Sequence, residues 1–479
     1  MERINKLEQL ARLLESSMNQ RREAREKADA YIDDFLQNLP QMHGYSTGRL
    51  EKLESFQIEE GGKSIDSILD VLASEVDRIG INPASGRHLG YIPGGGLWAS
   101  SIGDQLAAIT NRYAGIAFSS PGAVKIEDHV IKWMVSVIGY PDNAYGNLTS
   151  GGSTANLIAI KAARDHRKIN SGNITKAVIY MTEQVHHCVH KAIHTTGLHE
   201  AELHLIPMNG KFQMDADELE TQVLEDDSNG LAPFLVIASA GTTDTGAIDP
   251  LDRIGSVCEK LKIWFHVDVA YGGFFMLVDS MKKKLKGIER SDSIVLDPHK
   301  TMFIPFGSGA VLLRDRNILL ASNSYRANYM KDTFDVEEIN PADTGIELSR
   351  HNRSLRMWLP LQLYGIGPLR ASLEEKLLLC EYFDKQIRRL GFETAVSPEL
   401  SISVFRWPAD KDNSVNQRLI ALVHSDGRVF LSSTVIDGRL WLRCAIICHR
   451  THRFEIDLAL QMISEKIDEA LSSQPSPYE

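Results

Sequence analysis

An acidic residue ends a strongly apolar run in Phe265-His266-Val267-Asp268-Val269-Ala270-Tyr271-Gly272-Gly273. The run is typical of a buried strand, and a carboxylate at its end needs a partner because burying an unpaired charge is expensive. One alternative is a structural salt bridge, and another is a cap for the following helix. Asp268 alone therefore marks a candidate site without saying what the site binds.

A second apolar run ends in a lysine, in Ser291-Asp292-Ser293-Ile294-Val295-Leu296-Asp297-Pro298-His299-Lys300. Lys300 follows Asp268 by 32 residues. A lysine at the end of a buried strand is expected to have a lowered pKa and to act as an amine nucleophile toward carbonyls. A lone lysine is more often a surface charge, but the neighbouring acidic strand end favours a site.

Similar runs continue on both sides of these two, from about residue 145 to residue 315. Short apolar, β-branched runs alternate there with helical patterns, which predicts an α/β fold with a mostly parallel sheet and helices on both faces. Ligands of such sheets bind at the carboxyl ends of the strands. The expected strands are Ala177–Met181, Leu203–Ile206, Phe234–Ala238, Trp264–Val267, Ser293–Leu296 and Ala310–Leu313, with helices at Asn156–Arg167 and Leu251–Leu261.

The whole chain divides into three expected parts: an N-terminal helical segment (1–90), a large α/β domain (91–365) and a small C-terminal α+β domain (366–479). The first 40 residues are expected to be helical, with an apolar stripe that packs on another subunit or on the same chain. The stripe consists of Ile4, Leu7, Leu10 and Leu14. The small domain is expected to contain helices Leu373–Leu390 and Phe454–Ser472 and strands Ser401–Arg406 and Leu440–Cys444.

Composition indicates a globular, acidic protein. Of 479 residues, 24% are charged and 43% hydrophobic, and 52 basic against 63 acidic residues give a net charge of −11. This balance excludes a global footprint for nucleic acid or an anionic membrane. Five cysteines without a CxxC pair suit a reducing compartment, and the sequence has neither a secretory signal nor a transmembrane run. A cytoplasmic location is expected.

Two further motifs could contribute to a site. Thr149-Ser150-Gly151-Gly152-Ser153-Thr154-Ala155-Asn156 precedes an apolar helix, where backbone N–H groups favour an anion, although an ordinary helix cap has the same composition. His186, His190 and His194 fall four residues apart and would share one helix face. Such a face could bind zinc, but no HExxH motif is present, so we favour one imidazole that stacks on a flat ligand.

Together the four motifs offer an anion cradle, a buried carboxylate, an amine nucleophile and a flat ring. This set matches the needs of pyridoxal 5'-phosphate, with its phosphate on the helix start, Asp268 at its ring nitrogen and Lys300 at its aldehyde. A metal-dependent hydrolase that uses the histidine face is the alternative from another class of enzyme. A cofactor-binding but inactive regulatory protein is the alternative that is not an enzyme.

The chain resembles the group II pyridoxal-phosphate-dependent amino-acid decarboxylases of fold type I, the family of aromatic-L-amino-acid, glutamate and tyrosine decarboxylases. The resemblance runs from about Arg87 to about Arg453. It implies a carboxy-lyase, and a homodimer whose N-terminal helices wrap the partner and whose subunits share active sites. The motifs that carry it are Thr149–Asn156, Gln184-Val185-His186, Gly241-Thr242-Thr243, His266–Gly273, Pro298-His299-Lys300 and Arg353-Ser354-Leu355-Arg356-Met357-Trp358.

The resemblance also implies roles for single residues. Lys300 would be the Schiff-base lysine, Asp268 the partner of the ring nitrogen, and Tyr329 the donor of a proton to the substrate carbon after CO2 leaves. No metal ligand is implied. The other implied contacts are His186 and Ala270 on the two ring faces, Thr243 beside the ring, Gly152, Ser153 and His299 at the phosphate, and Tyr91 and Pro93 with His186 at the substrate.

Departures from the family pattern concern the phosphate and the substrate. Asp297 stands where animal members often carry Asn, and a carboxylate there would repel a phosphate unless it points away or pairs with a cation, so we leave it out of the cofactor contacts. Ile92 stands where the aromatic members carry a larger ring. We expect an aromatic or neutral amino acid as substrate. Glutamate or another acidic or aliphatic amino acid, and an aldehyde-forming reaction, are the alternatives.

Overall fold

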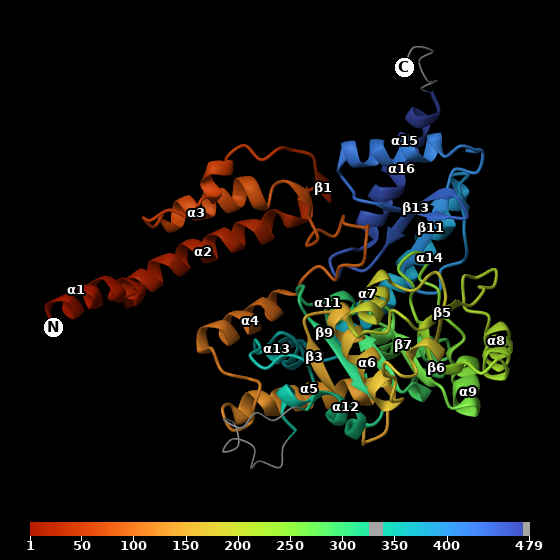
Figure 1. The fold of residues 1–479 in the computed structure, drawn as a ribbon. Helices are drawn as coiled ribbons and strands as arrows, with labels where there is room; N and C mark the ends of the chain where they lie inside the picture. Colours follow the sequence, from red (N-terminus) through yellow and green to blue (C-terminus); the bar gives the residue numbers. More distant parts are fainter. Residues whose placement is uncertain (325–338, 473–479) are drawn as a thin grey trace.

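In the computed structural model, which describes residues 1–324 and 339–472, seven strands form one central sheet (Figure 1). β9 is antiparallel to both its neighbours, and the other strands pair in parallel. The fold is therefore α/β with a mostly parallel sheet, as predicted. In sheet order the strands are β3 (Tyr145–Thr149), β9 (Gly309–Leu313), β8 (Ser293–Leu296), β7 (Trp264–Asp268), β6 (Ala232–Ser239), β4 (Ala177–Met181) and β5 (Glu202–Leu205).

The six predicted strands match observed ones to within one or two residues. Five of them are apolar runs that the sheet buries, whereas β5 is the edge strand and is largely exposed. Every residue of β4, β7 and β9 is buried. β3 is also buried along its whole length, yet the sequence does not predict it. Gly146 and Asn147 interrupt its apolar pattern, so its burial comes from its position beside β9 and not from its own composition.

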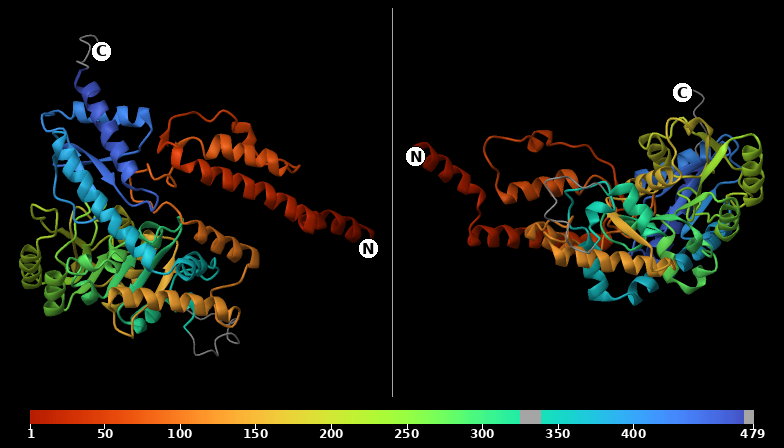
Figure 2. Two further views of the ribbon diagram at one scale, coloured as in Figure 1. Left: turned by 180° about the vertical axis from the view of Figure 1, so that it is seen from behind. Right: turned by 60° about the horizontal axis from the view of Figure 1, so that its bottom comes forward.

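Helices cover both faces of the sheet, with α6 and α7 on one face and α5 and α14 on the other (Figures 1 and 2). α9 has its predicted bounds, and α6 starts four residues before its predicted start, at the glycine-rich motif. The helices of this part are α4 (Trp98–Thr110), α5 (Pro121–Ile138), α6 (Gly152–His166), α7 (His187–Thr195), α8 (Ala216–Ser228), α9 (Leu251–Leu261), α10 (Asp279–Lys282), α11 (Pro298–Thr301), α12 (Arg316–Asn323) and α13 (Ser354–Tyr364).

A second, antiparallel sheet lies in the C-terminal part, with the order β10-β11-β13-β12. It packs with three helices around its own apolar core, to which Phe383 and Phe405 belong. Leu89 belongs to the same core although it precedes the large sheet in sequence. The predicted domain boundaries stay predictions. The elements are α14 (Gly367–Arg389), β10 (Glu393–Thr394), β11 (Ile402–Arg406), α15 (Ser414–Asp426), β12 (Ser432–Ile436), β13 (Arg439–Ala445) and α16 (Arg453–Ser472).

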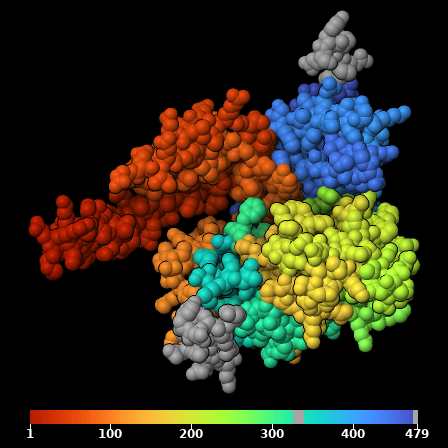
Figure 3. Space-filling model, viewed as in Figure 1, coloured from red at the N-terminus to blue at the C-terminus, as the bar shows by residue number. Residues whose placement is uncertain are grey.

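The N-terminal helices project from the rest of the chain as an arm (Figures 1 and 3). The arm consists of α1 (Glu2–Ala11) and α2 (Met18–Asn38), whose residues are all described and none of them buried. The expected continuous helix is interrupted between them, because Ser17 caps α2: its backbone N–H donates to the Gln20 side chain at 2.8 Å. α3 (Ile65–Val71) and the short strands β1 (Tyr45–Ser46) and β2 (Gly80–Ile81) follow. Among the described residues, no helix combines the length and the apolarity needed to span a bilayer.

Candidate active site

A cavity of about 330 Å³ lies where the loops after β3, β4, β6, β7 and β8 meet. Its position agrees with the rule that ligands of such sheets bind at the strands' carboxyl ends. All eight residues predicted to contact a cofactor line it. They are Gly152, Ser153, His186, Thr243, Asp268, Ala270, His299 and Lys300.

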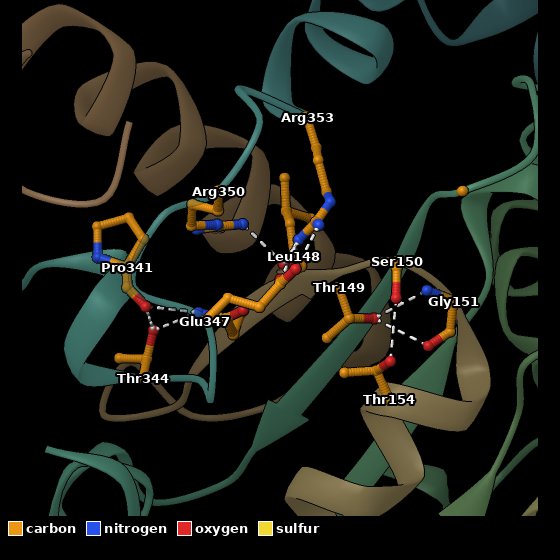
Figure 4. A network of polar contacts seen from close by, with 12 residues as sticks. Leu148, Thr149, Ser150, Gly151, Thr154, Pro341, Thr344, Glu347, Arg350 and Arg353 are labelled. Atoms are coloured by element: carbon orange, nitrogen blue, oxygen red, sulfur yellow. Dashed lines mark hydrogen bonds and ion pairs between the residues drawn. The ribbon is translucent and has the colours of Figure 1, made fainter. Parts of the chain in front are cut away.

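The glycine-rich loop after β3 is held from two directions (Figure 4). Within the loop, the Thr149 hydroxyl donates to the Gly151 carbonyl at 3.0 Å. Just before it, the Leu148 carbonyl accepts from the guanidinium groups of Arg350 (2.7 Å) and Arg353 (3.2 Å). The two arginines therefore fix the end of β3, and with it the loop that leads into the first turn of α6.

Close packing explains two glycines at this cradle. A Cβ on Gly309 of β9 would lie 2.6 Å from the backbone of Gly151, and a Cβ on Gly152 would lie 2.8 Å from the Asp297 carboxylate. Either side chain would push the loop out of place. The start of α6 is thus packed tightly between β9 and the end of β8.

Asp268, the last residue of β7, is 8% exposed and has a donor on each oxygen. The Ala270 backbone N–H donates to Oδ1 at 3.0 Å, and the Asn156 side-chain Nδ2 donates to Oδ2 at 3.1 Å. Both oxygens are therefore held in place, and the carboxylate lies at one side of the cavity.

Lys300 follows β8 and forms an ion pair with Asp297, with 3.0 Å between Nζ and Oδ2. Burial disfavours the ammonium form, but the carboxylates of Asp297 and Asp268 outweigh it and raise the pKa of Lys300 above its ordinary value. The expectation of a lowered pKa is therefore wrong for these described residues. Asp297 Oδ1 is buried without a hydrogen-bond partner among them.

His186 caps the N-terminus of α7, where its Nδ1 accepts from the Cys188 backbone N–H at 3.3 Å. Burial lowers the pKa of His186, against the opposing effect of the Asp268 charge. Because α7 begins at His187, the predicted three-histidine helix face is wrong: His186 lines the cavity, while His190 and His194 are exposed. Within residues 1–324 and 339–472, no group of three or more His, Cys, Asp or Glu side chains could hold a metal ion.

His299 and Thr243 are each fixed through backbone groups. The His299 Nδ1 donates to the Ser308 carbonyl at 2.5 Å, and burial lowers the pKa of His299. The Thr243 loop is held from the C-terminal part by Arg443, whose guanidinium donates to the carbonyls of Thr243 and, at 2.9 Å, Asp244. A residue of β13 thereby positions a loop of the large sheet.

Of the three predicted substrate residues, His186 lines the cavity formed by the described residues, whereas Tyr91 and Pro93 do not. Pro93 is buried, and Tyr91 is 56% exposed and has a φ of 49°. Their segment still contacts the lysine turn, since the Gly94 N–H donates to the His299 carbonyl at 3.1 Å. Tyr329 lies outside the described residues.

Several lining or supporting residues escape prediction from the sequence. Asn156 is the last residue of the glycine-rich motif, and this position is the sequence feature that could have identified it. Arg443 gives none, because its contact joins segments about 200 residues apart in the chain. The others are Ser150, Gly151, Thr154, Gln184, Cys188, Ser239, Gly241, Thr242 and Tyr271.

Comparison with known proteins adds a family and a fold. The model of the pyridoxal-dependent decarboxylase conserved domain matches residues 55–407. The chain is 31% identical over 458 residues to the aromatic-L-amino-acid decarboxylase of Bacillus atrophaeus, covering 93% of this chain and 95% of the relative. It is 27% identical over 459 residues to phenylacetaldehyde synthase of Arabidopsis thaliana, covering 92% and 93%. Its fold is similar to the crystal structure of Oryza sativa TDC with PLP and tryptamine, with a TM-score of 0.87 and 24% identity over 95% of this chain and 98% of that chain.

Proposed function

Because the chain belongs to the pyridoxal-dependent decarboxylase family, we propose that it converts an aromatic L-amino acid into the amine and CO2. Membership makes it a carboxy-lyase that uses pyridoxal phosphate. The observation that carries the assignment of the site is the cavity that brings Lys300, Asp268 and His186 together from three strand ends. Each of these side chains has the chemistry that one part of the cofactor needs.

The residues of the cavity fit pyridoxal phosphate. A volume of about 330 Å³ suits a ligand of this size. The N-terminus of α6 and the hydroxyl of Ser153 supply donors for a phosphate. The Asp297 carboxylate lies beside Gly152 at the start of α6 and opposes an anion there, and Lys300 at 3.0 Å offsets its charge.

When bound, pyridoxal phosphate supplies a ring that takes up the electrons left on the substrate carbon as CO2 departs. Asp268 would hold a proton on the ring nitrogen, because an opposite charge favours the cationic form. Lys300 would hold the cofactor at its aldehyde carbon through its amine, with the aldehyde oxygen lost as water. His186 would stack on the ring and orient the substrate carboxylate.

The remaining roles concern binding and the last proton transfer. Gly152, Ser153 and His299 would hold the phosphate, while Ala270 and Thr243 would contact the ring. Tyr329 gives its proton to the substrate carbon, and this assignment rests on its sequence motif. Tyr91 and Pro93 contact the substrate, which is supported by the contact of their segment with the Lys300 turn.

The identity of the substrate is tested with a panel of amino acids. Purified protein saturated with pyridoxal phosphate should release CO2 from tryptophan, tyrosine or phenylalanine and leave the amine. The names of the aromatic decarboxylase and of phenylacetaldehyde synthase among its relatives support an aromatic substrate. Release from glutamate alone would contradict the proposal. Aldehyde and hydrogen peroxide in place of amine would assign the chain to the oxidative reaction.

The role of Lys300 has a separate test. Borohydride reduction of the loaded protein should fix the cofactor irreversibly to the tryptic peptide that contains Lys300. Lys300→Ala should lose this label and all measurable decarboxylation, since the amine nucleophile is gone. The exposed Lys282, whose Nζ pairs with Asp279 at 2.7 Å, gives the matched control Lys282→Ala, which should keep both. A label that persists in Lys300→Ala contradicts the role.

The protein acts as a homodimer, in which the arm of each subunit wraps its partner. The support is the predicted stripe, whose members Ile4, Leu7, Leu10 and Leu14 are 59%, 55%, 59% and 89% exposed. An apolar stripe of this kind marks an interaction surface. Leu10→Glu should shift sedimentation toward the monomer, while Gln9→Glu adds the same charge to α1 and should not. A wild-type protein that is both monomeric and active would overturn the dimer.

A cytoplasmic location is supported by the cysteines. All five are described, and all are buried free thiols, as a reducing compartment maintains them. They are Cys188, Cys258, Cys380, Cys444 and Cys448. Fractionation of the native cell checks this location.

A further inference from the structure

A line of hydrogen bonds runs behind Asp268, away from the cavity. Trp264 Nε1 lies 2.9 Å from Ser293 Oγ, which lies 2.8 Å from His266 Nδ1. His266 Nε2 lies 2.9 Å from Asn156 Oδ1, and Asn156 Nδ2 lies 3.1 Å from Asp268 Oδ2. We call the four residues behind Asp268 the relay.

The fold places the relay in the centre of the sheet. Trp264, His266 and Asp268 alternate along β7 and so project to one face. Ser293 is the register partner of His266 on β8, and Asn156 reaches down from α6, which packs on the same strands. His266, Ser293 and Asn156 are fully buried, and Trp264 is 3% exposed. Water therefore does not compete for these bonds.

The groups at the two ends of the relay determine which atom is the donor in each of its hydrogen bonds. The indole N–H only donates, so Ser293 accepts from Trp264 and turns its own proton toward His266 Nδ1. At the other end Asn156 Nδ2 faces the carboxylate of Asp268 and, at 3.0 Å, the carbonyl of Gly152, which only accept. The amide oxygen of Asn156 must then accept from His266.

The middle of the relay is consistent with both ends. His266 accepts at Nδ1 and therefore carries its proton at Nε2, which is the tautomer that Asn156 requires. Burial lowers the pKa of His266 to about 4, so the ring is neutral at physiological pH. Every donor in the line points toward Asp268.

We propose that Asn156, His266, Ser293 and Trp264 are positioning residues that fix the orientation and the negative charge of Asp268 for the ring nitrogen of the cofactor. Asn156 fills one acceptor site of Oδ2, and the Ala270 N–H fills one of Oδ1. The carboxylate cannot rotate without breaking a bond on each oxygen. Its remaining lone pairs are left for the cavity that it lines.

This inference rests on the proposed function, and the experiment separates the two. The probe is the analogue of pyridoxal phosphate in which carbon replaces the ring nitrogen, compared with pyridoxal phosphate itself. Dissociation constants of both for the cofactor-free protein are measured by fluorescence quenching. A wild-type protein that binds neither ligand would refute the proposed function. Equal affinity for both would refute the role of Asp268, and the relay with it.

Variants of the relay residues should show a smaller preference for pyridoxal phosphate over the analogue that lacks the ring nitrogen. Asn156→Leu should weaken pyridoxal phosphate about tenfold, because a donor to a buried charge is lost, and should weaken the analogue much less. Trp264→Phe lies farthest from the cavity and should weaken pyridoxal phosphate about threefold through the relay alone. Ser293→Ala removes a single oxygen and serves as the mild variant where Asn156→Leu fails to fold.

Asn416 provides the matched control. It is fully buried and donates its amide to the Asp410 carboxylate at 2.6 Å, but it lies in the C-terminal part. Asn416→Leu should destabilise the protein and leave the ratio of the two dissociation constants at its wild-type value. A merely structural relay would weaken both ligands equally in Trp264→Phe and Ser293→Ala, and that result would overturn the inference.

Discussion

Two carboxylates lie at the ends of neighbouring strands, and they differ in how fully their oxygens are hydrogen-bonded. Asp268 ends β7 with a donor on each oxygen. Asp297 follows β8, the next strand of the sheet, and keeps one buried oxygen without a hydrogen-bond partner among the described residues. Its other oxygen pairs with Lys300. Both carboxylates line one cavity. Asp268 is held by hydrogen bonds on both oxygens and by the relay, whereas Asp297 lacks such a network within the described part of the chain.

The largest effect is expected from breaking the fixed charge. Asp268→Asn keeps the shape but removes the charge and sets an amide against donors, so kcat should fall by about a hundredfold or more. Steady-state decarboxylation at saturating pyridoxal phosphate measures it. Asp297→Asn is the control with the same chemical change one strand away. Equal losses of kcat in the two variants would erase the contrast between the carboxylates.

Acid should lower the stability of the protein through His266, which belongs to the relay behind Asp268. The pKa of His266 is about 4 when folded, because of burial, and about 6.5 when unfolded. Between these values the unfolded chain binds a proton that the folded chain does not, so the free energy of unfolding falls as pH drops through this window. Buried His88, with a pKa of about 4, acts in the same sense.

Denaturant unfolding at pH 7 and pH 5 measures this dependence. His266→Gln should reduce its slope by up to about 1.4 kcal/mol per pH unit, the share of one proton. His190→Gln changes an exposed histidine and should leave the slope unchanged. A slope that is identical in wild type and His266→Gln would show that the buried ring is not kept neutral.

Asp297 is expected to weaken the binding of pyridoxal phosphate, whereas Asp268 is expected to strengthen it. Asp297→Asn is expected to tighten pyridoxal phosphate about fivefold at pH 8, because a buried charge near the phosphate cradle is removed. The gain should shrink near pH 5.5, where the phosphate carries less charge, since its second pKa is about 6. Titration of the cofactor-free protein at both pH values tests this. Weaker binding by the variant would mean that Asp297 supports the site through Lys300.

The smallest effect concerns a loop that touches neither carboxylate. Arg443→Lys keeps a charge in β13 but loses the fork that holds the carbonyls of Thr243 and Asp244. Affinity for pyridoxal phosphate should fall about threefold, with kcat nearly unchanged. Arg439→Lys, at the exposed end of the same strand, is the control. A larger loss of kcat than in Asp268→Asn would reverse the ranking of the two regions.

The sequence predicts most of the sheet and eight of the residues that line the cavity, because apolar runs define buried strands and strand ends define the site. It does not predict what depends on distant partners. The pKa of Lys300 has the opposite direction to the expected one, since the ion pair with Asp297 exists only in the folded turn. The clamp by Arg443 likewise depends on a tertiary contact. The start of α7 at His187 depends on a local one, the cap that His186 provides through the Cys188 backbone N–H.

The exposure of the two-helix arm affects the resistance of the protein to proteolysis. Arg12, Arg21 and Arg22 are exposed in or beside helices that bury no residue of their own. In the proposed homodimer the partner would cover part of this arm, and subunits that separate on dilution would present it to proteases. Trypsin should therefore trim a dilute sample faster than a concentrated one. The lifetime of the enzyme would then depend on its own abundance.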